Sequence, residues 1–138
     1  MRAELARRLL TAAYEVERAT NAALRGTGLE LAHYLVISHL VEHESAATSD
    51  LGRVALVPPA TLTRVLDKLV DLALVYRTLD TTDRRRILVR VTDRGRVRSR
   101  ECAELIDLAI ADALPALREG DTCTLSDTFN ELTREAGG

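Results

Sequence analysis

The fold is decided by one stretch, Leu74-Val75-Tyr76-Arg77-Thr78-Leu79-Asp80-Thr81-Thr82-Asp83-Arg84-Arg85-Arg86-Ile87-Leu88-Val89-Arg90-Val91-Thr92-Asp93-Arg94-Gly95. Two short apolar runs flank a polar tip, and this pattern predicts a β-hairpin. Three consecutive arginines close the tip. One helical pattern stands directly before the first run, and another begins directly after the second. The stretch therefore predicts a basic hairpin set between two helices.

Working outward, apolar residues at helical spacing predict helices over most of the remaining chain. The expected ranges are about 3–24, 27–41, 50–56 and 59–72 before the hairpin, and a long helix from residue 92 and a short one at 125–134 after it. Thr27 to Glu30 has capping-box spacing, and Thr48, Ser49 and Thr92 are the expected caps of later helices. Pro59 suits a first helical turn, Pro115 should kink or end the long helix, and Gly120 should end it at the latest.

Length and composition place the chain in a broad class. With 138 residues it is long enough for one domain with a single core. Aromatic residues make up 3%, and Trp is absent, so a stacking platform for RNA or single strands is not expected. Two cysteines are too few for a disulfide framework, and neither a secretory signal nor a membrane span is visible. We therefore expect a cytoplasmic protein.

Charge is unevenly distributed along the chain. Residues 77–100 hold nine arginines and three aspartates, whereas residues 101–138 hold two arginines and nine acidic residues, and the whole chain has a net charge of −2. One basic segment in an acidic chain indicates a surface for a polyanion, with binding confined to one face. The alternative is a solvated arginine-rich surface, which composition alone would favour.

A helix-turn-helix pattern followed by a basic hairpin is typical of the winged helix-turn-helix, which binds DNA. Three pieces then resemble the MarR family of bacterial regulators: Asp50-Leu51-Gly52-Arg53-Val54-Ala55-Leu56, Thr61-Leu62-Thr63-Arg64-Val65-Leu66-Asp67-Lys68-Leu69, and the wing from Asp83 to Gly95. The resemblance implies a mainly α fold with a small β-hairpin wing, in which a winged helix-turn-helix core is joined by N- and C-terminal dimerisation helices. Residues 1–138 would form one MarR-like domain, with a DNA-binding lobe at 27–95 and dimerisation helices at 1–26 and 96–138.

A recognition helix reads base edges in the major groove with its first turns, and a wing arginine suits a narrow minor groove. Arg64 would pair with a guanine or hold a phosphate, and Arg85 is the expected minor-groove residue. The residues expected to contact DNA are Pro59, Ala60, Thr61, Thr63, Arg64, Lys68, Arg77, Arg84, Arg85 and Arg86. By resemblance, Asp83 shapes the wing tip without touching DNA. The alternative for each residue is plain surface exposure, and for Arg90 we prefer it. Pro58 stands where the family usually has a polar cap, and this leaves the start of the recognition helix open by a residue or two.

The resemblance also implies partners. We expect a homodimer on a pseudo-palindromic double-stranded DNA operator, acting as a ligand-responsive repressor. Packing of the terminal helices against each other within one chain is the alternative to dimerisation. No cofactor and no membrane partner are expected. A small-molecule effector would lie between the dimerisation helices and the lobe, and its candidate lining is Tyr14, His33, Tyr34 and Ile37.

Other chemistry has little support in the sequence. His39 and His43 have metal-chelating spacing but more often form polar helix surface, so no metal site is assigned. Cys102 has arginines nearby that would lower its pKa, yet a buried inert thiol is the simpler interpretation. No motif of an enzyme is present, and we expect none. The competing function is a winged helix that binds protein, or acts as an anti-repressor, without specific DNA binding.

Overall fold

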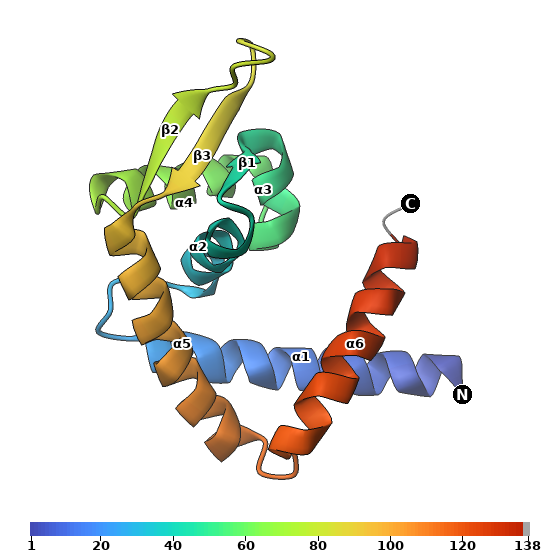
Figure 1. Cartoon of the computed structure of the whole chain (residues 1–138). Helices are drawn as coiled ribbons and strands as arrows, with labels where there is room; N and C mark the ends of the chain where they lie inside the picture. The colour runs from blue at the N-terminus through green and yellow to red at the C-terminus, as the bar shows by residue number, and fades with distance from the viewer. Residues whose placement is uncertain (137–138) are drawn as a thin grey trace.

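The computed structural model describes residues 1–136, so residues 137 and 138 of the predicted C-terminal segment lie outside the described part. Its elements are α1 (Arg2–Leu24), α2 (Leu31–His43), β1 (Ser45–Ala47), α3 (Thr48–Ala55), α4 (Pro59–Asp71), β2 (Val75–Leu79), β3 (Ile87–Val91), α5 (Asp93–Ala113) and α6 (Glu119–Ala136). Helices α2 to α4 and the sheet form a lobe above α1 (Figure 1). The predicted fold class, mainly helical with a small β wing, is confirmed.

The three strands form an antiparallel sheet in the order β1-β3-β2. β2 pairs with β3 from Val75 opposite Val91 to Leu79 opposite Ile87, and this pairing is the predicted hairpin. β1 pairs with the other edge of β3, with Ser45 opposite Arg90. β1 was not predicted. It ties the root of the hairpin to the end of α2 and the start of α3, so the hairpin is anchored to the lobe on both sides.

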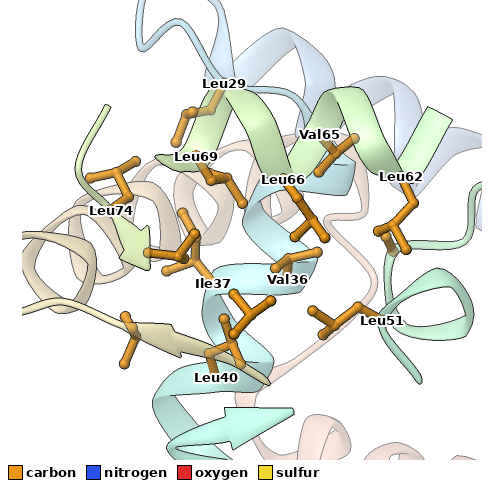
Figure 2. Close-up of a cluster of buried hydrophobic side chains, with 14 of the residues drawn as sticks. Leu29, Val36, Ile37, Leu40, Leu51, Leu62, Val65, Leu66, Leu69 and Leu74 are labelled. Atoms are coloured by element: carbon orange, nitrogen blue, oxygen red, sulfur yellow. The ribbon is translucent and has the colours of Figure 1, made fainter. Parts of the chain in front are cut away.

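The core of the lobe is built around α2. Val36, Ile37 and Leu40 of α2 are fully buried. Leu66 and Leu69 of α4 approach them from one side, and β3 lies on the other (Figure 2). Burial of each large aliphatic side chain contributes about 1.5–3 kcal/mol, so this cluster fixes the position of α4 relative to the sheet.

Helix ends follow the predictions only in part. The hydroxyl of Thr92 accepts a hydrogen bond from the backbone N–H of Gly95 at 2.9 Å, so the predicted cap of α5 is confirmed. The capping box of α2 is formed by Glu30 and His33 instead of Thr27 and Glu30. Thr27 is used one turn earlier, where its hydroxyl donates to the carbonyl of Leu24 at 2.6 Å.

Two further ends differ from expectation. α3 begins at Thr48 itself and has no side-chain cap, because Thr48 and Ser49 lie inside its first turn. α5 ends at Ala113, two residues before Pro115, as predicted. α6 begins at Glu119, six residues earlier than expected, so Gly120 lies within its first turn and does not stop a helix. The early start places α6 directly after the Pro115 turn.

The terminal helices leave a large apolar surface open. α1 packs along α5, whereas α6 turns away beyond the Pro115 turn (Figure 1). Large apolar side chains are exposed on all three helices, namely Leu5, Leu9, Leu10, Tyr14, Val16, Leu105, Leu108, Leu125, Phe129 and Leu132. Among the helices of the described residues, none is both long enough and apolar enough to span a bilayer.

Candidate nucleic-acid interface

The outer face of α4 presents most of the predicted recognition residues to solvent. Pro59, Ala60, Thr63, Arg64 and Lys68 are exposed, and Thr61 is half-buried. The opposite face is buried in the core through Leu62, Val65, Leu66 and Leu69. The helix is therefore held from behind while its first turns are free to enter a groove.

The start of α4 is where the sequence predicted it. Pro58 is the N-cap residue, with φ −62° and ψ 157°, and Pro59 is the first helical residue. The backbone carbonyl of Pro58 accepts from the N–H of Leu62 at 3.0 Å, so the first helical hydrogen bond is made without a capping side chain. The hydroxyl of Thr63 lies 3.4 Å from the carbonyl of Pro59, so it bonds within its own helix in this state.

The wing tip, residues 80–86, is an ordered loop. The N–H of Asp80 donates to the carbonyl of Arg86 at 3.0 Å, and the N–H of Arg86 donates to the carbonyl of Asp83 at 2.9 Å. The carboxylate of Asp83 accepts from the N–H of Arg85 at 3.1 Å and from its guanidinium Nε at 3.3 Å. Hydrogen bonds from the N–H and hydroxyl of Thr82 lower the pKa of the Asp80 carboxyl. These contacts are of the kind expected of Asp83, and its role in DNA binding stays a prediction.

The three arginines of the tip point outward to different degrees. Arg84, Arg85 and Arg86 are all exposed, and the side chain of Arg85 is 93% accessible. Arg86 lies 3.9 Å from the carboxylate of Asp50 on α3. In contrast, Arg84 forms no ion pair within residues 1–136. The tip therefore carries exposed guanidinium groups of which two already face a carboxylate.

A second ion pair joins the wing to the recognition helix. Arg77 of β2 donates to the carboxylate of Asp67 on α4 at 2.7 Å. Both side chains remain partly exposed, so the pair contributes little to stability, but it fixes two elements that would contact the same DNA. Sequence analysis left Arg77 as a phosphate contact or a partner at the wing stem. The structure places it as the latter.

Sequence reasoning missed two residues beside the wing. A cavity of about 380 Å³ at the base of the hairpin is lined by Thr48 and Ser49 of α3 together with Arg85 and Arg86. Thr48 and Ser49 were interpreted as helix caps. The pairing of β1 with β3, which brings them to the arginines, spans more than 40 residues and leaves no local signal in the sequence.

The four candidate effector residues do not form one site in the described chain. Ile37 is fully buried in the core and His33 is 6% exposed, whereas Tyr14 is 60% exposed on α1. Tyr34 is half-buried on α2. Nδ1 of His33 accepts a hydrogen bond from the backbone N–H of Glu30 at 2.9 Å, which commits this side chain to the cap of α2.

The remaining candidates are placed as follows. The rings of His39 and His43 stack at 4.2 Å between centroids, and Nδ1 of His43 lies 3.0 Å from the carbonyl of His39. Within the described residues, no group of three or more potential metal ligands is gathered. Cys102 is buried, which raises the pKa of its thiol, while Cys123 is exposed on α6. Neither pair of residues adds a site to the interface.

Comparison with known proteins gives a consistent result. Residues 27–86 match the model of a family described as the MarR family. No curated protein sequence matches the chain. Among solved structures, a MarR-family transcriptional regulator from Rhodococcus sp. RHA1 superposes with a TM-score of 0.82 at 24% identity, covering 96% of this chain and 94% of that one.

Two other solved structures contain a bound molecule. A mutant MarR from E. coli, complexed with operator DNA, superposes with a TM-score of 0.73 at 23% identity, covering 94% of this chain and 93% of that one. CouR from Rhodococcus jostii RHA1, bound to p-coumaroyl-CoA, superposes with a TM-score of 0.74 at 26% identity, covering 90% and 87%. The chain thus shares its fold with these proteins over nearly its whole length.

Proposed function

Because the chain belongs to the MarR family of winged-helix DNA-binding regulators, we propose that it represses transcription by binding a pseudo-palindromic operator as a homodimer. α4 would read the major groove through Arg64 and its neighbours, and the wing would place Arg85 in the minor groove. Lys68, Arg84 and Arg86 would hold phosphates, which set position without reading sequence.

One observation carries this proposal. The exposed face of α4 and the arginines of the wing come from elements that are joined by the Arg77–Asp67 ion pair and backed by a shared core. Two basic surfaces held in fixed relation match the major groove and the adjacent minor groove of one duplex. A protein-binding winged helix would have no need for this concentration of arginine.

Exposed apolar residues on α1, α5 and α6 support the homodimer. Leu10 and Leu108 are more than 70% exposed, and Leu132 is 53% exposed. A contiguous apolar surface of this kind marks an interface, and a second copy would bury it. Twofold symmetry would then present two recognition helices to half-sites one helical turn apart.

A ligand-responsive mode of action follows the same reasoning. CouR, which shares the fold, is bound to p-coumaroyl-CoA in its crystal structure. We propose that this chain also responds to a small molecule, which would bind one arrangement of the two recognition helices better than the other and so shift the population.

The DNA-binding proposal is tested by fluorescence anisotropy on a duplex from the region upstream of the protein's own gene. We expect Arg85→Ala to weaken binding by about tenfold, the loss of one good base or groove contact, without changing the melting temperature. The matched control is Arg118→Ala, an exposed arginine in the α5–α6 turn, which should bind as the wild type does. An unchanged dissociation constant for Arg85→Ala would remove the wing from the mechanism.

Light scattering at micromolar concentration tests the dimer. The wild type should have twice the mass of one chain, and Phe129→Asp should shift the mass toward one chain because a carboxylate would be buried in the interface. A wild-type monomer under these conditions would refute the proposal.

A further inference from the structure

A groove of about 480 Å³ lies where α1, α2 and the turn between α3 and α4 meet. The three walls are the dimerisation helix, the first turns of the central helix and the entrance to the recognition helix. Its lining consists of Ala13, Val16, Glu17, Asn21, Glu30, Leu31, Ala32, Leu35, Ala55, Leu56 and Val57. None of the four effector residues expected from the sequence is among them, so this groove is a different site.

The composition of the lining selects a type of ligand. Most of the lining is aliphatic, which suits a ligand with an apolar body, and the volume is in the range of small-molecule sites. The charged side chains in the lining are Glu17 and Glu30, and both are acidic. Arg25 and Lys68 line a separate hollow beyond Asn21, and neither forms an ion pair with Glu30 among the described residues.

Donors that would favour an anion at this place are already in use. The first N–H groups of α2 face the groove, and a free helix N-terminus would attract a carboxylate or phosphate. However, the N–H of Leu31 donates to the side-chain oxygen of Asn21 at 3.1 Å. The N–H of His33 donates to the Glu30 carboxylate, and the N–H of Tyr34 donates to the Glu30 carbonyl at 3.2 Å. An anionic ligand would therefore meet two carboxylates and few open donors.

We propose that this groove binds a cationic small molecule, with an apolar body against Val16, Leu35 and Val57 and a protonated amine near Glu17 and Glu30. Glu17 is exposed on α1 and is free to turn toward the amine. Glu30 adds its charge from the cap of α2. The ligand class rests on the proposed function only in its effect on DNA, because the groove itself is complete within one chain.

Occupancy of the groove reaches the recognition helix through the third wall. Leu56 adopts a left-handed conformation, with φ of 57°, and its side chain is 76% exposed at the rim. The N–H of Val57 donates to the carbonyl of Gly52 at 3.3 Å, and Pro58 and Pro59 follow directly as the first residues of α4. A ligand that packs on Leu56 and Val57 would therefore displace the start of α4, and operator DNA would in turn weaken ligand binding by the same factor.

The test uses two ligands of equal shape and opposite charge, 2-naphthylmethylamine and 2-naphthoate, titrated by calorimetry into the full-length protein. We expect the amine to bind and the carboxylate to bind at least tenfold more weakly. Glu17→Gln should weaken the amine about threefold or more, in line with the loss of one exposed charge partner. Glu42→Gln removes an exposed carboxylate elsewhere on α2 and should leave the amine affinity unchanged. Ala13→Leu, which fills the groove, should weaken both ligands.

A second measurement separates this inference from the proposed function. Operator affinity by anisotropy should fall when the amine is present at saturation. Absence of amine binding, equal or tighter binding of the carboxylate, or an unchanged amine affinity in Glu17→Gln would overturn the ligand assignment, while operator binding would still stand. Amine binding by a protein that never binds DNA would instead refute the proposed function and keep the groove.

Discussion

A single methyl group at Gly95 should destabilise the whole lobe. Gly95 lies in the first turn of α5, and a Cβ built there would overlap the backbone carbonyl oxygen of Leu74 and come within 2.8 Å of Cγ2 of Val91. That carbonyl oxygen accepts hydrogen bonds from both the N–H and the hydroxyl of Thr92, at 3.0 Å and 3.1 Å. The methyl group would therefore have to push aside the acceptor that holds the cap residue of α5.

The magnitude follows from three contributions. Losing or stretching two hydrogen bonds costs about 1–3 kcal/mol, and crowding at a packed position costs a further ~1–3 kcal/mol. Alanine recovers about 1 kcal/mol because it is the better helix former. We therefore expect Gly95→Ala to lower the free energy of unfolding by about 3 kcal/mol, which corresponds to a fall in melting temperature of about 10 °C for a chain of this size.

Thermal and urea unfolding at one fixed protein concentration measure this change, since dimerisation makes stability depend on concentration. Gly120→Ala is the matched control: it also lies in the first turn of a helix, but a Cβ there meets nothing within 4 Å. It should be neutral or stabilising. If Gly95→Ala is as stable as Gly120→Ala, the close approach of α5 to Leu74 is not a constraint and the reasoning is refuted.

Two further predictions concern charges in the lobe. Burial, and secondly the charge of Lys68, lower the pKa of His33 below 6.5, so the unfolded chain takes up its proton more readily; stability should fall as the pH drops through about 6.5, and unfolding curves should show a smaller loss in His33→Gln. The exposed Arg77–Asp67 pair should contribute about 0.5 kcal/mol to stability in a double-mutant cycle with alanine, yet Arg77→Ala should weaken operator binding, because the wing is no longer tied to α4; a coupling energy above about 2 kcal/mol would contradict the first statement, and unchanged binding the second.

Local patterns in the sequence predicted the elements that bury one face. The apolar positions of α4 and the alternation around the hairpin are read within ten residues, and Thr92 signals its helix from an adjacent position. β1 could not be found in this way, because Ser45 and its two alanine neighbours have weak preference for strands and their partner lies more than 40 residues away. Pairing with β3 creates this strand.

The candidate site shows the same boundary. Exposure of Arg64 and the tip arginines follows from their place in the pattern. The pairing of Asp67 with Arg77 and the gathering of Thr48 with Arg85 depend on tertiary contacts that spacing does not encode. Ile37 was predicted to line a cleft, but a central helix packed on several sides has no open apolar face, and periodicity does not show how many sides are covered.

The strand order β1-β3-β2 also bears on how the chain avoids self-association through its wing. The most apolar strand, β3, is in the middle, so both of its hydrogen-bonding edges are satisfied within the chain. Of the two outer strands, β1 is only three residues long, and β2 carries the charged Arg77. Short or charged borders are poor templates for an incoming strand. The protein can therefore hold a protruding hairpin out into solvent without seeding edge-to-edge aggregates.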